Sequence, residues 1–161
     1  MAVSASDGPG AEGPDGPYGA PLLQRELSLE PDGRSAGAAR RFLRSCFEQA
    51  GLDSRSEAGV LAISEIVTNV VLHARTPMEV RLVAYPDHAC VEVGDGDQTP
   101  PVQPGPDLEA TVGRGLALVA AVSTSCGVRS LGAAGKVVWF CIGDPPGHTV
   151  GDLPAPWAVC S

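Results

Sequence analysis

Three polar residues are spaced so that they share one face of a predicted apolar helix. Glu65, Asn69 and His73 lie four residues apart in the segment EIVTNVVLHA, and residues at this spacing stand one above the other on a helix. The amide oxygen of Asn69 suits Mg²⁺, a hard cation that usually accompanies phosphate, and Glu65 can orient or deprotonate a nucleophile. A polar face that merely emerges into solvent would give the same spacing, because a single E-x-x-x-N pattern has low specificity.

A second candidate is the carboxylate of Asp95. In the segment VEVGDG an apolar strand runs directly into Asp95 and Gly96. A carboxylate at a strand end, beside flexible backbone, can accept a hydrogen bond from an exocyclic amine such as that of adenine. Taken alone, an ordinary Asp-Gly turn is the simpler interpretation of this pair.

The third candidate is a glycine-rich segment before a predicted helix. Gly113, Arg114, Gly115 and Leu116 lead into the apolar run ALVAAV. Glycines at such a point let the backbone approach a phosphate, and the helix N-terminus offers free N–H groups and a partial positive charge. Arg114 adds a further donor. A loop-to-helix turn that needs flexible backbone is the alternative, and without a third glycine the pattern is no dinucleotide fingerprint.

Hydrophobic periodicity predicts the elements that position these residues. Two amphipathic helices are expected, one from Ser35 to Ala50 and one from Ser56 to Ala74, each with its serine as N-cap, and a short third helix at Leu116–Val122. Strands are expected at residues 22–29, 78–84, 90–93, 126–129 and 136–142. Hairpin strands beside helices in this order predict an α+β two-layer sandwich rather than a doubly wound parallel sheet.

In this fixed order the motifs are specific, and the chain resembles the GHKL (histidine kinase/Hsp90-like) ATPase superfamily. The resemblance covers residues 22–142 and is carried by EIVTNVVLHA, VEVGDG, GRGLALV and GKVVWF. It is strongest to the small bacterial branch of anti-sigma-factor serine/threonine kinases. It implies the Bergerat-type ATP-binding fold, a two-layer α/β sandwich in which a mixed, mostly antiparallel sheet packs on three helices.

The resemblance also implies a role for each candidate residue, with ATP and Mg²⁺ as cofactors. Glu65 corresponds to the catalytic base, Asn69 to the Mg²⁺ ligand, and His73 to a residue that faces the phosphates. Asp95, with Gly96 beside it, corresponds to the residue that reads the adenine amino group. The phosphate-contacting glycine box corresponds to Gly113, Arg114, Gly115 and Leu116, and residues 96–112 correspond to the lid over ATP.

The chain departs from the family pattern at two points. Asp97 adds a second carboxylate near the nucleotide, which weakens anion binding. The late strand GKVVWF has Val137 and Val138 where the family offers a threonine that supports the adenine aspartate through a water. Thr111, just before the glycine box, is the nearest alternative hydroxyl.

These residues lead to one functional hypothesis and one alternative. The hypothesis is a Mg·ATP-binding regulator of the anti-sigma type, which phosphorylates a serine or threonine of an antagonist protein and controls transcription through a sigma factor. The alternative is a non-catalytic or nucleotide-free interaction module of the same fold. The expected partners are a sigma factor, its antagonist, or both, and a second copy in a homodimer.

Composition bounds the remaining possibilities. The 161 residues include 20 glycines and 15 prolines, which gather in a disordered acidic leader at 1–21, in the lid and in a flexible tail at 143–161. The formal charge of −8 argues against direct nucleic-acid binding, which needs a basic stripe. No G-x-S-x-G, G-x-x-x-x-G-K-[ST] or H-E-x-x-H motif is present, which argues against those enzyme classes.

The sequence also predicts a cytoplasmic protein. No signal peptide and no apolar run that approaches membrane-spanning length are recognised. The five cysteines are scattered and include no C-x-x-C, which favours buried free thiols in a reducing compartment.

Overall fold

The computed structural model describes residues 20–98 and 111–143, and only the backbone of 111–116. The expected leader at 1–21, lid at 96–112 and tail at 143–161 lie mostly outside the described residues. These three assignments therefore stay predictions.

The elements follow the predicted order, and their bounds differ by a few residues. They are β1 (Leu23–Leu29), α1 (Ser35–Gln49), α2 (Ser56–Asn69), β2 (Met78–Ala84), β3 (His88–Asp95), α3 (Thr111–Val122), β4 (Ser125–Ser130) and β5 (Lys136–Gly143). A π-helical turn, Val70–Ala74, extends α2, and short 3₁₀ turns occupy Asp53–Arg55 and Gly132–Ala134.

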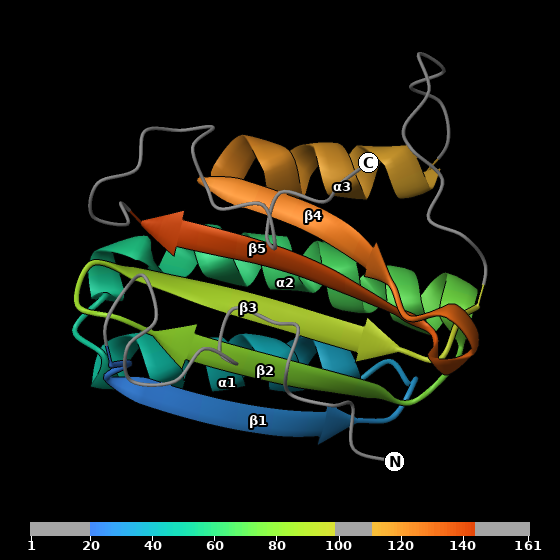
Figure 1. The fold of residues 1–161 in the computed structure, drawn as a ribbon, viewed down its shortest axis with the longest axis horizontal. Coiled ribbons are helices and arrows are strands. Elements are labelled where there is room, and N and C mark those ends of the chain that lie inside the picture. Colours follow the sequence, from blue (N-terminus) through green and yellow to red (C-terminus); the bar gives the residue numbers. More distant parts are fainter. Residues whose placement is uncertain (1–19, 99–110, 144–161) are drawn as a thin grey trace.

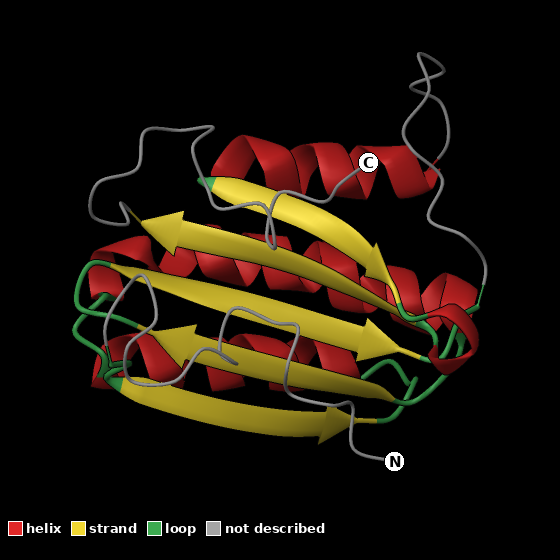
Figure 2. Cartoon of the chain, in the orientation of Figure 1, coloured by secondary structure: helices red, strands yellow, loops and turns green. Residues whose placement is uncertain are grey.

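The strands form one sheet in the order β1-β2-β3-β5-β4. The helices α1, α2 and α3 lie on one face of it (Figure 1, Figure 2), which confirms the α+β two-layer sandwich. The expected mixed sheet is wrong for the described strands, because all four pairings are antiparallel. The reason is topological: β3 and β4 run in the same direction, but β5 lies between them.

The core fills the space between the helices and the sheet. On α1 the side chains of Leu43 and Phe47 are buried one turn apart, and both lie beside Gly59 of α2. A Cβ at Gly59 of α2 would lie 3.1 Å from the Phe47 ring, so glycine permits this close approach. From the strands, alternate residues point into the core, namely Val80, Leu82, Val91, Val93, Val138 and Phe140.

Two expected helix caps are wrong. α1 and α2 begin at Ser35 and Ser56, and neither helix has a side-chain hydrogen bond at its N-cap. The Ser35 hydroxyl instead donates to the Glu30 carbonyl. A serine near a helix start can be the N-cap or the first residue of the helix, and the sequence alone does not distinguish these two positions.

The expectation that no apolar run approaches membrane-spanning length is wrong for the helical run Asp53–Ala74, which has 22 residues. By length and composition it is the one described helix that could cross a membrane. Its buried residues include Ala62, Ile63, Ile66 and Val67, which pack in the core cluster with the sheet. A core helix of a two-layer fold needs the same apolar composition.

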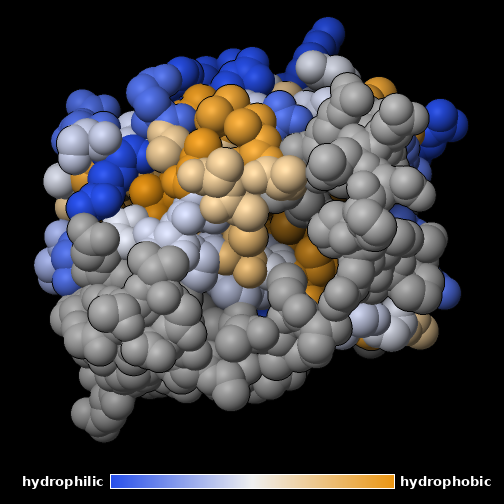
Figure 3. Space-filling model, turned by 90° about the horizontal axis from the view of Figure 1, so that it is seen from above, coloured by the Kyte–Doolittle hydropathy of each residue, from blue (hydrophilic) through white to orange (hydrophobic). Residues whose placement is uncertain are grey.

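At the other end of the helical layer, α3 packs against α2, β4 and β5. Ala117, Ala120 and Ala121 are exposed on it, and Leu118 is half-buried. Figure 3 shows hydrophobic side chains gathered on this side of the molecule.

The expectation of free thiols is wrong for two of the five cysteines. Cys90 and Cys141 form a disulfide with a Cα–Cα distance of 4.1 Å. They face each other directly in the β3–β5 register and pack with Trp139 on the sheet face opposite the helices. A sequence separation of 51 residues hides this pairing, and the argument from thiols to a reducing compartment fails for this pair.

Candidate functional site

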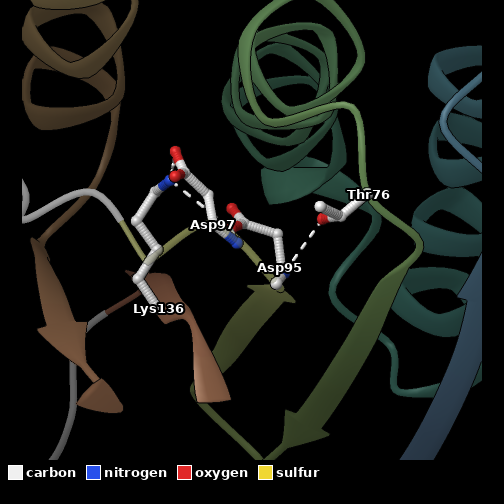
Figure 4. A network of polar contacts seen from close by, with 5 residues as sticks. Thr76, Asp95, Asp97 and Lys136 are labelled. Atoms are coloured by element: carbon white, nitrogen blue, oxygen red, sulfur yellow. Dashed lines mark hydrogen bonds and ion pairs between the residues drawn. The ribbon is translucent and has the colours of Figure 1, made fainter. Parts of the chain in front are cut away.

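The end of the second helix is joined to the end of β3. After the π-helical turn, Arg75 adopts a left-handed conformation with φ 55°, and its N–H donates to the Val70 carbonyl at 2.7 Å. The chain then reaches Thr76, whose hydroxyl accepts the Gly96 N–H at 2.9 Å (Figure 4). π-Helical turns and left-handed residues concentrate at functional sites.

Asp95 is the last residue of β3, and its side chain is only 1% exposed. One carboxylate oxygen, Oδ1, accepts the Asp97 N–H at 2.8 Å and lies 3.4 Å from Lys136 Nζ. The other oxygen, Oδ2, is buried and has no hydrogen-bond partner. Native structures rarely leave a buried carboxylate oxygen unsatisfied. Oδ2 therefore has room to accept a hydrogen bond from one further donor.

Lys136 is the residue that the sequence analysis missed. It opens β5 directly opposite Asp95 in the β3–β5 register, and its Nζ lies 2.9 Å from Asp97 Oδ2 (Figure 4). The additional carboxylate of Asp97 is thus paired with a cation. The segment GKVVWF has no hydroxyl, but it supplies an ammonium donor to Asp95 instead.

Gly135 allows β5 to start this close to β3. Its φ of 112° is unfavourable for other residues, and a Cβ there would collide with the Asp95 carbonyl oxygen and lie 2.9 Å from Gly96 Cα. The glycine in GKVVWF is therefore required to bring Lys136 to Asp95.

Glu65 and Asn69 lie one turn apart on α2, and both are half-buried. His73 is exposed and lies in the π-helical turn, so the regular four-residue column does not continue to it. Within the described part of the chain, no hydrogen bond or ion pair reaches the side chain of Glu65 or Asn69. Their polar groups are available to a ligand, and neither side chain is hydrogen-bonded to Asp95 in the described residues.

The glycine box lies inside α3 and not before it. The helix begins at Thr111 instead of Leu116, so Gly113, Arg114, Gly115 and Leu116 all belong to its first turns. The apolar spacing of Val112, Leu116 and Val119 continues across the glycines, and each glycine weakens a helix by only about 1 kcal/mol. The free N–H groups of the first turn then begin at Thr111.

Asn69 could hold a metal ion only together with ligands from outside the described side chains. No group of three or more His, Cys, Asp or Glu side chains that could hold a metal occurs among the described residues. A cation on the Asn69 oxygen would need further oxygen ligands, and Mg²⁺ usually takes these from phosphates and water. The buried Asp95 Oδ2 is an acceptor for a donor such as an amine.

Comparisons with known proteins agree with this architecture. Residues 29–142 match the model of a family described as the histidine kinase-like ATPase domain. A crystal structure of the RsbU and RsbW domains of Rv1364c from Mycobacterium tuberculosis is similar, with a TM-score of 0.57 and 22% sequence identity. The similarity covers 77% of this chain but only 32% of that one. No curated protein sequence matches.

Proposed function

The chain belongs to the histidine kinase-like ATPase domain family, and from this premise we propose that it binds Mg·ATP and acts as an anti-sigma-type regulator. In this role it transfers phosphate to a serine or threonine of an antagonist protein and controls a sigma factor in the bacterial cytoplasm, as a homodimer. The family match over residues 29–142 supports nucleotide binding. The fold shared with a structure whose title names an RsbW domain supports the regulatory role.

The observation that carries nucleotide binding is the unsatisfied Oδ2 of Asp95. It lies at the end of β3, on the helix-facing side of the sheet, in a side chain that is almost wholly buried. An exocyclic amine satisfies this oxygen without displacing the donors on Oδ1.

The residues of α2 supply the chemistry at the phosphate end. Asn69 holds Mg²⁺ through its amide oxygen, and bound Mg²⁺ neutralises charge on the transferring phosphoryl group. Glu65, one helical turn earlier, accepts the proton of the attacking hydroxyl. The first turn of α3 offers its free N–H groups to the phosphates.

A module that binds nucleotide without phosphotransfer is the second candidate. One observation favours it: no described residue orients the Glu65 carboxylate, whereas a general base is usually held by a neighbouring group.

Calorimetric titration with Mg·ATP tests the proposal. We expect saturable binding to the wild type and at least a tenfold loss in Asp95→Asn, because a hydrogen bond to a charged group contributes about 1.5–3 kcal/mol. Asp87→Asn is the matched control: this aspartate precedes the other end of β3 and contacts His88. No binding to the folded wild type would refute both nucleotide-binding functions.

Phosphotransfer is tested separately, with labelled ATP and a candidate antagonist protein. Transfer to a hydroxyl of that partner supports the kinase function. Nucleotide binding without transfer supports the second candidate.

A further inference from the structure

We propose that Lys136 positions Asp95 and that the Lys136–Asp97 pair sets the preference of this site for a purine with an exocyclic amine. The inference rests on the proposed nucleotide binding and adds a specificity-determining residue to it.

Two donors hold the Asp95 carboxylate at one of its oxygens. Both donors that reach it, the Asp97 N–H at 2.8 Å and Lys136 Nζ at 3.4 Å, approach the same oxygen, Oδ1. Because Oδ1 is held from two directions, the plane of the carboxylate is fixed and Oδ2 is left as the acceptor that faces a ligand. Without Lys136, one of the two restraints on this plane is lost.

Lys136 also balances the charge of two carboxylates. Asp95 and Asp97 bring two carboxylates to a site that must receive an anionic nucleotide, and Lys136 Nζ lies within 4 Å of both. The three side chains are 1%, 25% and 19% exposed, respectively for Asp95, Asp97 and Lys136. Partly buried charges are screened weakly by solvent. The ammonium group therefore lowers the repulsion that the carboxylates exert on the phosphates.

The strand register places Lys136 beside Asp95. Lys136 is the β5 residue paired with Asp95, and Gly135 lets the backbone of β5 approach Asp95 and Gly96 without a clash. The position of Lys136 thus follows from the sheet itself and not from a freely moving surface side chain.

The experiment compares two ligands by calorimetry, Mg·ATP and the magnesium salt of purine riboside triphosphate, which lacks the exocyclic amine. The proteins are the full-length wild type, Lys136→Met, Lys136→Arg and the double variant Lys136→Met/Asp97→Asn. Arg129→Met is the matched control, because this cation pairs with Glu92 on the opposite face of the sheet. Thermal melts establish that each variant is folded.

We expect the wild type to prefer ATP by at least about tenfold, as for a hydrogen bond to a charged acceptor. Lys136→Met should weaken binding of both ligands and bring the ratio of their affinities close to one. Lys136→Arg should keep the ratio. The double variant should regain affinity for both ligands, because the repulsion is removed, but not the ratio, because the positioning donor is still absent.

A merely structural role of Lys136 would leave the ratio unchanged, and that result in folded Lys136→Met overturns the inference. An equal fall of the ratio in Arg129→Met overturns it too. If Lys136→Met does not fold, the folded double variant is used instead. A ratio of ATP affinity to purine riboside triphosphate affinity equal to that of the wild type then overturns the inference. If the wild type prefers ATP to purine riboside triphosphate but substitution of Lys136 does not change this preference, the proposed function stands and the inference fails. If the wild type binds neither ligand, both fail.

Discussion

Asp95 shows at the residue scale that the site is not built for stability alone. A buried carboxylate oxygen without a partner costs about 1–3 kcal/mol, and Asp95 Oδ2 is such an atom. Sequence reasoning identified Asp95 as the end of a strand, and the structure agrees. It did not identify Lys136, because a contact across 41 residues depends on strand register, which local periodicity does not specify.

The two polar residues of α2 have separable roles, which single substitutions distinguish. We expect Glu65→Ala to keep its affinity for Mg·ATP and to lose phosphotransfer by a factor of about 10²–10⁴, the usual contribution of a general base. Asn69→Ala should lose the magnesium-dependent part of nucleotide binding. The measurements are calorimetry with and without Mg²⁺ and a phosphotransfer assay.

Thr68→Ala is the control for both substitutions, because Thr68 is an exposed neighbour on the same helix. Normal phosphotransfer by Glu65→Ala would show that another group is the base. Magnesium-independent binding by the wild type would remove the role of Asn69.

Cys46 allows a prediction of pH dependence. Burial raises the pKa of its thiol from 9.0 to about 11, although Arg25 acts in the opposite direction. The native state thus holds the proton more tightly than the unfolded state does. The resulting stability is complete below pH 9 and is lost as the pH rises from 9 to about 11.

Denaturant midpoints measured at pH 8, 9, 10 and 11 check this expectation for Cys46. The wild type should lose stability over this range more steeply than Cys46→Ala, in which the group is absent. Equal slopes for the two proteins would contradict it. Native Cys46 should also resist alkylation at pH 8, since the thiolate is the reactive form.

At the scale of elements, the start of β5 lies beside the end of β3, and the segment that follows α2 reaches the same place through Thr76. Periodicity predicted all eight of the main elements, because apolar residues alternate in the strands and recur every three or four residues in the helices. It did not predict where α3 begins, since glycine lowers helix propensity without forbidding a helix. The π-helical turn before Arg75 also escaped it, because an insertion of one residue barely changes the apolar pattern.

Gly135 gives the prediction at this scale. Gly135→Ala should destabilise the fold by about 1–3 kcal/mol or more, the usual cost of a strained backbone, because the new Cβ meets the Asp95 carbonyl. It should also weaken Mg·ATP binding, because the clash displaces the end of β3.

Gly132→Ala is the matched control for Gly135→Ala. Gly132 also has a positive φ, 60°, but a Cβ there meets nothing within 4 Å. Urea unfolding and calorimetry of both variants separate backbone conformation from steric collision. Equal losses of stability and affinity would mean that the close approach of β5 to β3 is unimportant.

At the scale of the whole molecule, the two faces of the sheet differ in the side-chain clusters that pack on them. The helix-facing side has a continuous apolar core, whereas the opposite side carries the small cluster of Cys90, Trp139 and Cys141.

The charge is also distributed unevenly along the chain. All 11 Lys and Arg residues lie between residues 22 and 142, so the −8 charge belongs partly to the two ends of the chain. The order of the predicted elements led to the two-layer fold, but the covalent link between the central strands could not be derived from it.

The disulfide gives the prediction for the whole fold. Cys90–Cys141 links β3 to β5 across 51 residues of sequence, and closing a loop of this size stabilises a protein by typically 2–4 kcal/mol. We expect a thiol reductant to lower the urea midpoint of the wild type and to leave Cys90→Ala/Cys141→Ala unchanged. Alkylation of the unfolded, non-reduced chain followed by mass spectrometry should leave these two cysteines unmodified.

The backbone register aligns Asp95 with Lys136 independently of the disulfide, so the reduced, folded protein should keep its affinity for Mg·ATP. A parallel loss of affinity on reduction would show instead that the disulfide maintains the register on which the site depends.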